Sequence, residues 1–232
     1  MPSTTPPPPE RLLVFARVPE AGAVKTRLAA SIGDDRALAV YEAMLSDVIA
    51  SVGESIPTRE IEYLWAPTSI ANAGTLRRAF GDRSMSMQTG ADLGDRLSMA
   101  FSERFFFHRA MKIIAIGVDD PLIPAELLDR AFHLLDSCEW VVGPATDGGY
   151  YLIGCRAAAF SVDVFSGIEW GASTVLAATL EKIQSRESSV ALLPPRSDID
   201  LAEDLDRFAA DSTRGALHEL LKVRQAGTEG PP

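Results

Sequence analysis

Three cations and two adjacent carboxylates stand at points of the sequence where a phosphate-handling site could form. Arg17, Lys25 and Arg27 lie in a loop that follows a short apolar run, and Asp119 and Asp120 directly follow another. A glycine-bearing loop between a first strand and a first helix can bind phosphates through backbone N–H groups and the helix N-terminus. The three cations could neutralise a triphosphate or a pyrophosphate. The two carboxylates could hold a hard divalent cation such as Mg²⁺.

Both groups of residues also have simpler interpretations. The loop, whose turn Pro19 and Gly22 would shape, is neither a Walker A sequence nor a G-x-G-x-x-G fingerprint, and a solvated charged loop would explain it. An aspartate before a proline commonly opens a turn or caps a helix. The site interpretation requires the two apolar runs to be neighbouring strands. The cations and the carboxylates would then lie on opposite sides of a nucleotide.

Two later segments carry groups suited to a second substrate and to the metal. The first is a tight turn that feeds a strand: Asp147, Gly148, Gly149 and Tyr150. Its glycines allow positive φ and a close approach to a ligand, although a plain turn would also explain them. In the second segment, Asp198 and Asp200 alternate before a helix and therefore share one face of an extended chain. They could complete a metal site with Asp119, although acids also suit a helix N-terminus.

Apolar patterns predict the frame that would position these residues. Strands are predicted at residues 12–16, 61–65, 84–88, 113–118, 140–144, 150–154 and 190–193. Helices are predicted at residues 37–52, 68–80, 93–107, 124–135, 173–183, 203–210 and 214–224. The run at 113–118 is typical of a strand buried on both faces, in the middle of a parallel sheet. Strands that alternate with helices, joined by connections too long for hairpins, predict a single three-layer α/β domain around a mostly parallel mixed sheet.

Composition and charge limit the classes of protein that this chain could belong to. The net charge of −10 argues against a nucleic-acid partner, because nothing supplies a basic face. No apolar run approaches the roughly 18 residues that span a bilayer, and no secretory signal is evident, so we expect a cytoplasmic protein with no membrane partner. Cys138 and Cys155 fit no zinc pattern and are predicted to be buried small apolar residues. Residues 1–10, which are Pro-rich, and 226–232 are predicted to be disordered tails around a domain at 11–225.

Six short motifs occur in order between Leu12 and Leu205. They are Arg17-x-Pro19-x-x-Gly22-x-x-Lys25-Thr26-Arg27-Leu28, Asp92-Leu93-Gly94-Asp95-Arg96, Gly117-x-Asp119-Asp120-Pro121, Gly143-Pro144-Ala145-x-Asp147-Gly148-Gly149-Tyr150-Tyr151-Leu152-Ile153-Gly154, a segment around Trp170, and Asp198-Ile199-Asp200. The ordered set resembles the radical-SAM/selenodomain-associated bacterial transferase family, a group of nucleotide-diphospho-sugar-transferase-like proteins related to 2-phospho-lactate guanylyltransferase. This resemblance implies the GT-A fold, a Rossmann-like sheet that binds a nucleotide and a divalent metal.

The resemblance also implies roles for individual positions. The phosphate-binding loop would be matched by Arg17, Gly22, Lys25 and Arg27, and contacts to the base by Gln88 and Gly94. The metal-binding aspartate after the central strand would be Asp119, and a second metal carboxylate Asp200. The acceptor side would be matched by Asp147, Gly148, Gly149 and Tyr150. The sequence departs from the family pattern at Asp120, where cysteine is frequent, at Gly171, where serine is frequent, and at Leu201, where threonine is frequent.

These observations together predict a transferase that depends on Mg²⁺ or Mn²⁺, with Lys25 and Asp119 as catalytic residues. Its partners would be a nucleoside triphosphate or a sugar nucleotide, and a small-molecule acceptor. The cation-rich loop favours nucleotidyl transfer, because pyrophosphate is the larger leaving charge. The family resemblance favours glycosyl transfer. The alternative is a catalytically inactive protein that binds a nucleotide or a partner.

Overall fold

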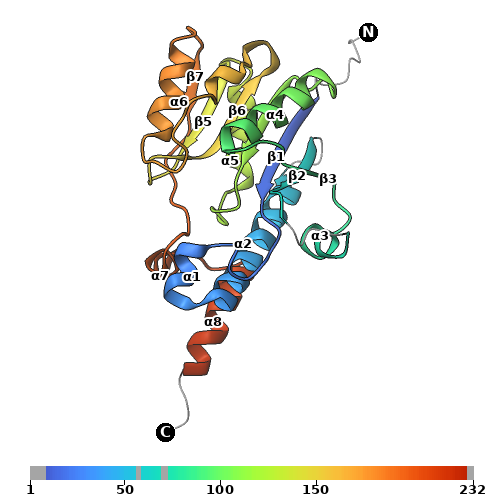
Figure 1. The fold of residues 1–232 in the computed structure, drawn as a ribbon. Coiled ribbons are helices and arrows are strands. Elements are labelled where there is room, and N and C mark those ends of the chain that lie inside the picture. Colours follow the sequence, from blue (N-terminus) through green and yellow to red (C-terminus); the bar gives the residue numbers. More distant parts are fainter. Residues whose placement is uncertain (1–8, 56–58, 69–72, 229–232) are drawn as a thin grey trace, which may run out of the picture.

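A seven-stranded sheet runs through the computed structural model, which describes residues 9–55, 59–68 and 73–228. Its strands are β1 (Glu10–Ala16), β2 (Glu60–Trp65), β3 (Met85–Met87), β4 (Lys112–Ile116), β5 (Trp140–Pro144), β6 (Tyr150–Arg156) and β7 (Val190–Leu192). They lie in the order β3-β2-β1-β4-β6-β5-β7 (Figure 1). Strand β6 is antiparallel to β4 and β5, and the other pairings are parallel. The mostly parallel mixed sheet predicted from the sequence is confirmed.

Apolar side chains of the strands point alternately into two separate cores. On β1, Leu12 and Val14 are fully buried in one core and Leu13 in the other. Strand β4 is buried at every position, as predicted for a central strand, and its Ile114 and Ile113 divide between the cores in the same way. Because both faces of the sheet bury apolar side chains, helices must cover both faces, which gives three layers.

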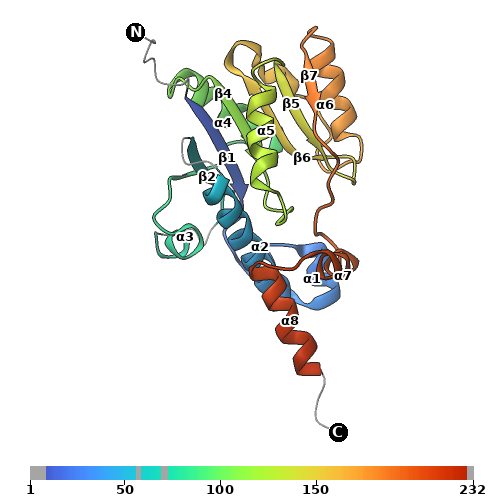
Figure 2. The ribbon, with the colours of Figure 1, turned by 180° about the vertical axis from the view of Figure 1, so that it is seen from behind.

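Helices cover the two faces and extend beyond one end of the sheet (Figures 1 and 2). Helices α2 (Asp34–Ser55), α3 (Ala73–Phe80) and α5 (Ala125–Leu134) pack into the first core, and α4 (Leu93–Phe106) and α6 (Val175–Gln184) into the second. Helices α1 (Thr26–Ile32), α7 (Ala202–Asp211) and α8 (Ala216–Thr228) lie beyond the carboxyl end of β1. Single 3₁₀ turns follow β6 at Ala157–Ala159 and Val162–Val164. Among the described residues, no helix combines the length and the apolar character that a membrane span requires.

Several element boundaries differ from the prediction. Strand β1 begins at Glu10, inside the predicted tail, because the Glu10 carboxylate accepts hydrogen bonds from Arg59 and Lys112. Helix α1 was not predicted, and it begins at Thr26, inside the stretch assigned to the loop. Helix α8 continues to Thr228, three residues into the predicted C-terminal tail, because the first helix-breaking proline comes only at residue 231. Residues 1–8 and 229–232 of the predicted tails, and 69–72 of the helix predicted to start at Thr68, lie outside the described residues.

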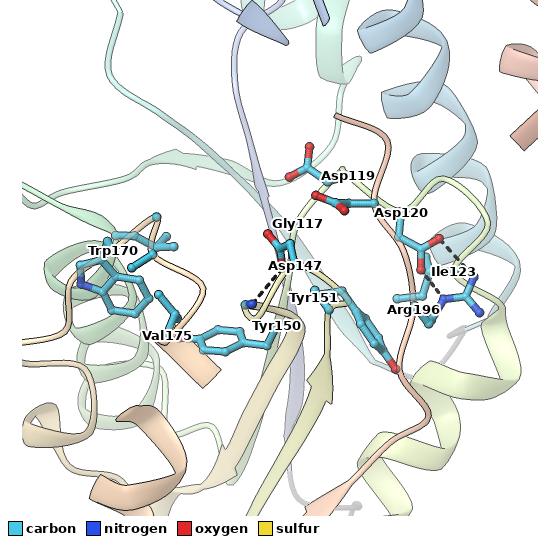
Figure 3. A pocket seen from close by; sticks show the side chains of 16 residues that line it. Gly117, Asp119, Asp120, Ile123, Asp147, Tyr150, Tyr151, Trp170, Val175 and Arg196 are labelled. Carbon is cyan, nitrogen blue, oxygen red and sulfur yellow. Dashed lines mark hydrogen bonds and ion pairs between the residues drawn. The ribbon is translucent and has the colours of Figure 1, made fainter. Parts of the chain in front are cut away.

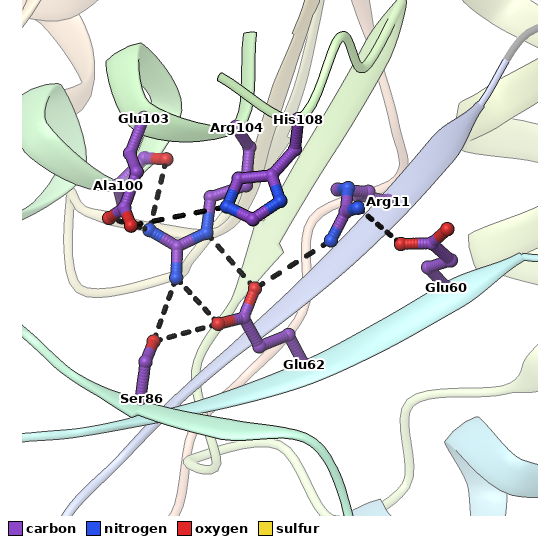
Figure 4. Close-up of polar contacts among 8 residues, drawn as sticks. All are labelled: Arg11, Glu60, Glu62, Ser86, Ala100, Glu103, Arg104 and His108. Atoms are coloured by element: carbon purple, nitrogen blue, oxygen red, sulfur yellow. Dashed lines mark hydrogen bonds and ion pairs between the residues drawn. The ribbon is translucent and has the colours of Figure 1, made fainter. Parts of the chain in front are cut away.

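A buried polar network fixes α4 against the strands (Figure 4). Arg104 donates to both carboxylate oxygens of Glu62 on β2, at 3.0 and 2.6 Å, and to the hydroxyl of Ser86 on β3, at 2.7 Å. Only 3% of the Arg104 side chain is exposed, so these bonds replace those that its guanidinium would make with water. The network therefore holds α4 in place, and with it the start of that helix at the carboxyl edge of the sheet.

The two cysteines are free thiols. Cys155 is buried in the second core, which confirms the prediction for that residue, and burial raises the pKa of its thiol. Cys138 is only half-buried, which is less than predicted. Its Sγ lies 4.0 Å from the Ser137 hydroxyl oxygen.

Candidate functional site

The residues predicted to carry chemistry gather at one edge of the sheet. Strands β1, β4 and β5 run parallel, so their carboxyl ends meet there, and the antiparallel β6 begins there. The chain after β1 carries Arg17 and the cationic loop, the chain after β4 carries Asp119, and the chain after β5 carries Asp147. Open α/β sheets bind ligands at this edge. Two adjoining cavities open here, and Asp119 lines both.

The first cavity, here called the cationic cavity, encloses about 380 Å³. Its lining includes four cations: Arg17, Lys25, Arg27 and Arg96. Gln88 and Asp200 also line it, so the structure brings together most of the residues predicted for phosphate and nucleotide binding. Gly22 does not line it; with φ of 76°, this glycine shapes the turn of the loop.

Two of the four cations of this cavity are paired with carboxylates that were predicted to bind metal. Lys25 Nζ donates to Asp119 Oδ1, and Arg27 Nη1 donates to Asp200 Oδ2 at 2.5 Å. The Lys25 side chain is 5% exposed, whereas that of Arg27 is 69% exposed. Lys25 also has a left-handed backbone with φ of 46°, a strained conformation that is frequent at functional sites. A ligand that binds to Lys25 or Arg27 must therefore displace these internal partners.

Two buried side chains hold the floor of the cationic cavity. Gln88 Nε2 donates to the carbonyls of Ala16 at 3.1 Å and Leu64 at 2.6 Å, which joins the ends of β1 and β2. This use of its amide nitrogen differs from the base contact that the family resemblance implies. The Tyr41 hydroxyl accepts from the backbone N–H of Arg17 at 2.7 Å and donates to its carbonyl at 3.1 Å. Burial raises the pKa of Tyr41, so this clamp on the loop stays uncharged.

The second cavity, here called the acidic cavity, encloses about 190 Å³ (Figure 3). Asp119, Asp147 and Asp198 line it. Tyr150 and Trp170 form an aromatic wall, with ring centroids 6.4 Å apart and the ring planes at 86°. The structure thus brings Asp147 and Tyr150, predicted for the acceptor side, together with two of the predicted metal ligands.

The charge of the acidic cavity is strongly unbalanced. The pKa of Asp198 is raised, first by burial and then by the negative charges of Asp147 and Asp119. Among the described residues that line this cavity, Arg196 is the one cation. Its guanidinium is already bound to the Asp120 carboxylate, 3.1 Å from Nη2 to Oδ1, and donates to the Leu122 carbonyl at 2.8 Å. Asp120 is 8% exposed, so it serves as the partner of this arginine and not as a free acid.

Two glycines let the segment around Trp170 press against the acidic cavity. A Cβ on Gly94 would lie 2.6 Å from Trp170 Nε1 and 2.4 Å from the carbonyl oxygen of Phe165. A Cβ on Gly148 would lie 2.0 Å from the carbonyl oxygen of Ser173. Neither glycine lines a cavity, so both act through close packing. For Gly94, this packing role differs from the contact with the nucleotide base that the family resemblance implies.

The predicted metal ligands lie around the junction of the two cavities. Asp198 lines the acidic cavity and Asp200 the cationic one, on either side of Ile199, whose N–H donates to the Asp119 carbonyl at 3.0 Å. Within the described part of the chain, no three acidic, histidine or cysteine residues form a group that could hold a metal. Mg²⁺ needs only one or two protein carboxylates when substrate phosphates supply the other ligands, and the carboxylate oxygens present here are the hard donors that it prefers.

Sequence reasoning missed Tyr41, Arg96 and Arg196 as parts of the site. Arg96 belongs to the Asp92–Arg96 motif, so the presence of a cation one turn into the helix could have indicated that it lines the site. Arg196 gave no signal, because its partner Asp120 is 76 residues away in the chain.

Comparisons with known proteins show which family and which folds this chain resembles. Residues 60–172 match the model of a family described as uncharacterized protein conserved in bacteria (DUF2064). A candidate nucleotide-diphospho-sugar transferase from Desulfovibrio desulfuricans is 31% identical, with a TM-score of 0.87 over 94% of this chain and 95% of that chain. No curated protein matched the sequence.

Two more distant structures share the fold. A cytidylyltransferase from Leptospira borgpetersenii serovar Hardjo-bovis is 15% identical, with a TM-score of 0.56 over 94% of this chain and 95% of that chain. A Mycobacterium tuberculosis protein in complex with manganese is 16% identical, with a TM-score of 0.54 over 88% of this chain and 100% of that chain.

Proposed function

This chain matches the DUF2064 model at residues 60–172, and it belongs to the same family as the candidate nucleotide-diphospho-sugar transferase with which it shares 31% identity over 94% of its length, so we propose that it is itself a transferase. Its donor is a nucleoside triphosphate or a sugar nucleotide, and its acceptor is a small molecule. A fold alone does not define a reaction. The observation that carries the proposal is the pair of adjoining cavities, one cationic and one acidic, that share Asp119. The six ordered motifs extend the proposal to a relation with the radical-SAM/selenodomain-associated transferases.

The cationic cavity suits the phosphates of the donor. Lys25 and Arg27 would leave their carboxylate partners and donate to phosphate oxygens, with Arg17 and Arg96 lining the same space. Because the Lys25 side chain is buried, its contact with a phosphate would be screened less by water than that of Arg27.

A divalent cation, Mg²⁺ or Mn²⁺, fits the carboxylates at the junction of the cavities. Asp119 would hold it together with Asp198 or Asp200 and the donor phosphates. When bound, the ion would supply positive charge that stabilises the charge developing on the phosphates. Release of Asp119 from Lys25 would serve both ligands, because it frees a carboxylate for the cation and an ammonium for the phosphate.

Two transfer reactions fit this arrangement. In nucleotidyl transfer, an acceptor phosphate oxygen bonds to the α-phosphorus of the triphosphate, and the bond to the bridging oxygen breaks, with its electron pair leaving on pyrophosphate. In glycosyl transfer, an acceptor hydroxyl oxygen bonds to the anomeric carbon of the sugar nucleotide. The bond from that carbon to the phosphate oxygen breaks, its electron pair leaves on the nucleoside diphosphate, and the hydroxyl proton passes to a base. In both reactions Lys25 and Arg27 would stabilise the leaving phosphate.

The test is a product assay on the full chain. The protein is incubated with Mg²⁺, a cell extract as acceptor pool, and each nucleoside triphosphate or sugar nucleotide in turn, and phosphorus NMR follows the products. Pyrophosphate identifies nucleotidyl transfer, and a nucleoside diphosphate identifies glycosyl transfer. Asp119→Ala should abolish either product, whereas Glu181→Gln, an exposed change on α6, should not. Full product formation by Asp119→Ala would contradict the proposal, and nucleotide binding with no turnover would favour an inactive binding protein.

A further inference from the structure

We infer that the acidic cavity binds an uncharged polyhydroxylated group, such as a sugar ring, and rejects phosphorylated or carboxylated compounds. This inference rests on the proposed function and names the substrate class of one part of the same site. Two sources could supply the group: the sugar that a donor carries, or a separate hydroxyl-bearing acceptor. The shared chemistry is a ring or chain of neutral hydroxyls with an apolar C–H face.

The charge of the acidic cavity is the first reason to expect an uncharged occupant. An anion that enters the cavity would meet the carboxylates of Asp119, Asp147 and Asp198. Within the described lining, the only cation is Arg196, whose guanidinium is bound to the buried Asp120 carboxylate and to a backbone carbonyl. Like charges that face each other strongly disfavour binding. Neutral hydroxyls, by contrast, can donate to these oxygens without bringing in charge.

The divalent cation proposed at Asp119 does not reverse this selectivity. Its charge is shared between the protein carboxylates and the phosphates of the donor, which already supply anionic oxygens. A neutral group is therefore favoured over an anion in the cavity in the presence of metal and donor.

The aromatic wall is the second reason. Trp170 and Tyr150 stand across the cavity from Asp119 and Asp147 (Figure 3). An aromatic ring offers an apolar surface that can pack against the C–H face of a sugar, while carboxylates opposite it receive the hydroxyls. The absence of a side chain on Gly94 allows Trp170 to lie where it does. Burial raises the pKa of Tyr150, so this side of the cavity carries no charge.

Asp147 is placed to receive a hydroxyl. Its Oδ1 accepts from the Gly149 N–H at 2.8 Å, which fixes the orientation of the carboxylate, and the side chain is exposed to the cavity. An uncharged hydroxyl group in this position fits glycosyl transfer. Nucleotidyl transfer to a phosphate would instead bring an anion into the acidic cavity. The inference therefore favours glycosyl transfer between the two reactions.

The experiment measures binding at Trp170 and not turnover. The full chain is labelled with 5-fluorotryptophan, which gives one ¹⁹F signal for each of three tryptophans, and Trp170→Phe assigns the signal of residue 170. The probes are the methyl glycosides of glucose, galactose, mannose and N-acetylglucosamine, each compared with its 6-phosphate, together with glucuronic acid. Each is titrated in the presence of Mg²⁺ and a nucleoside diphosphate. Trp140, which is fully buried, provides an internal control.

We expect at least one neutral glycoside to shift the Trp170 signal, and its 6-phosphate to bind at least about tenfold more weakly. Asp147→Asn should reduce that discrimination several-fold, because asparagine keeps the oxygen that accepts from Gly149 but loses the charge. Glu181→Gln, which removes a charge outside the cavity, should leave it unchanged. Equal or tighter binding of the phosphates or of glucuronic acid would overturn the inference, as would no binding of any neutral probe.

Two further arms separate the possible sources and the possible failures. A sugar nucleotide that shifts Trp170 and blocks the shift by the free glycoside identifies the donor sugar as the occupant, whereas a glycoside that still shifts Trp170 beside bound sugar nucleotide identifies the acceptor. Calorimetry of the nucleoside diphosphate on the same samples reports on the cationic cavity. If the nucleotide binds but the selectivity is absent, this inference fails and the proposed function stands. If no nucleotide binds, the proposed function itself fails.

Discussion

Replacing Lys25 by methionine should make metal binding tighter and nucleotide binding weaker. In the free protein Lys25 Nζ is paired with Asp119 Oδ1. A divalent cation must therefore compete with Lys25 for the carboxylate, and a phosphate must compete with Asp119 for the ammonium. When both ligands bind together, each takes one member of the pair, and neither group is left alone. We therefore expect Mn²⁺ and a nucleoside diphosphate to raise each other's affinity in the native protein.

The size of the effect follows from the exposure of the two side chains. A hydrogen bond to a charged group contributes about 1.5–3 kcal/mol, whereas an exposed ion pair contributes about 1 kcal/mol or less. The Lys25 side chain is 5% exposed but that of Asp119 is 59% exposed, so we take the upper value for an exposed ion pair, about 1 kcal/mol, as the contribution of this pair. Lys25→Met should then bind Mn²⁺ about fivefold more tightly than the native protein. Loss of the ammonium should weaken nucleotide binding by about ten- to a hundredfold.

Calorimetry of Mn²⁺ alone, of a nucleoside diphosphate alone, and of each in the presence of the other measures these quantities. The diphosphate is the one that binds most tightly among those of the common bases. Lys222→Met is a matched control, because Lys222 lies on α8 and is 57% exposed. Lys25→Arg keeps the charge and should keep most of the coupling. If Lys25→Met binds Mn²⁺ no more tightly than the native protein, or if the native protein shows no coupling, the exchange of partners does not occur.

Three further predictions concern stability and packing. Gly94→Ala should cost about 1–3 kcal/mol of unfolding free energy and change Trp170 fluorescence, because its Cβ would overlap the indole; an unchanged spectrum would contradict this. Asp120→Ala should cost about 2–4 kcal/mol in urea unfolding, because it leaves a half-buried guanidinium unpaired. Burial alone would raise the pKa of the Glu62 carboxyl, but hydrogen bonds from Arg104 and Ser86 lower it overall. The ionised carboxylate therefore stabilises the fold at pH values above the ordinary pKa of a glutamate. The stability gap between the native protein and Glu62→Gln should therefore shrink as the pH falls through the lowered folded-state pKa; a gap that is constant down to pH 3 would refute this.

The frame could be predicted because its signals are local. The apolar run of β4 predicted a strand buried on both faces, and every residue of that strand is buried. Strand order and direction could not be predicted in the same way, because a period of two residues does not encode them. The connections were all predicted to be too long for hairpins, which is wrong for β5 and β6: β6 follows β5 after a short turn, pairs antiparallel with it, and pairs antiparallel with β4 on its other edge. Helix α1 was missed because it has only seven residues, a length at which periodicity carries little information.

The site could be predicted where a residue follows a strand, and not where it depends on a distant partner. Lys25 was singled out because it lies in the loop that follows one apolar run, and Asp119 because it follows another almost directly. Their ion pair joins residues 94 positions apart, and no local pattern reports such a contact. The division of Asp198 and Asp200 between two cavities also came only from the structure, since an extended segment predicts that they share one face.

The position of Asp119 explains why the two cavities can act as one site. Strand β4 is buried on both faces and paired on both edges, so the chain leaving it starts from the most constrained part of the sheet. Lys25, in contrast, lies at the far end of a loop that turns at Gly22 and that Tyr41 clamps at its start, at Arg17. When ligands separate the ion pair, the movement should therefore fall on the end of the loop that carries Lys25, while Asp119 keeps its place between the proposed donor and acceptor. A fixed carboxylate opposed by a movable cation is an arrangement in which donor binding can adjust one cavity without altering the other.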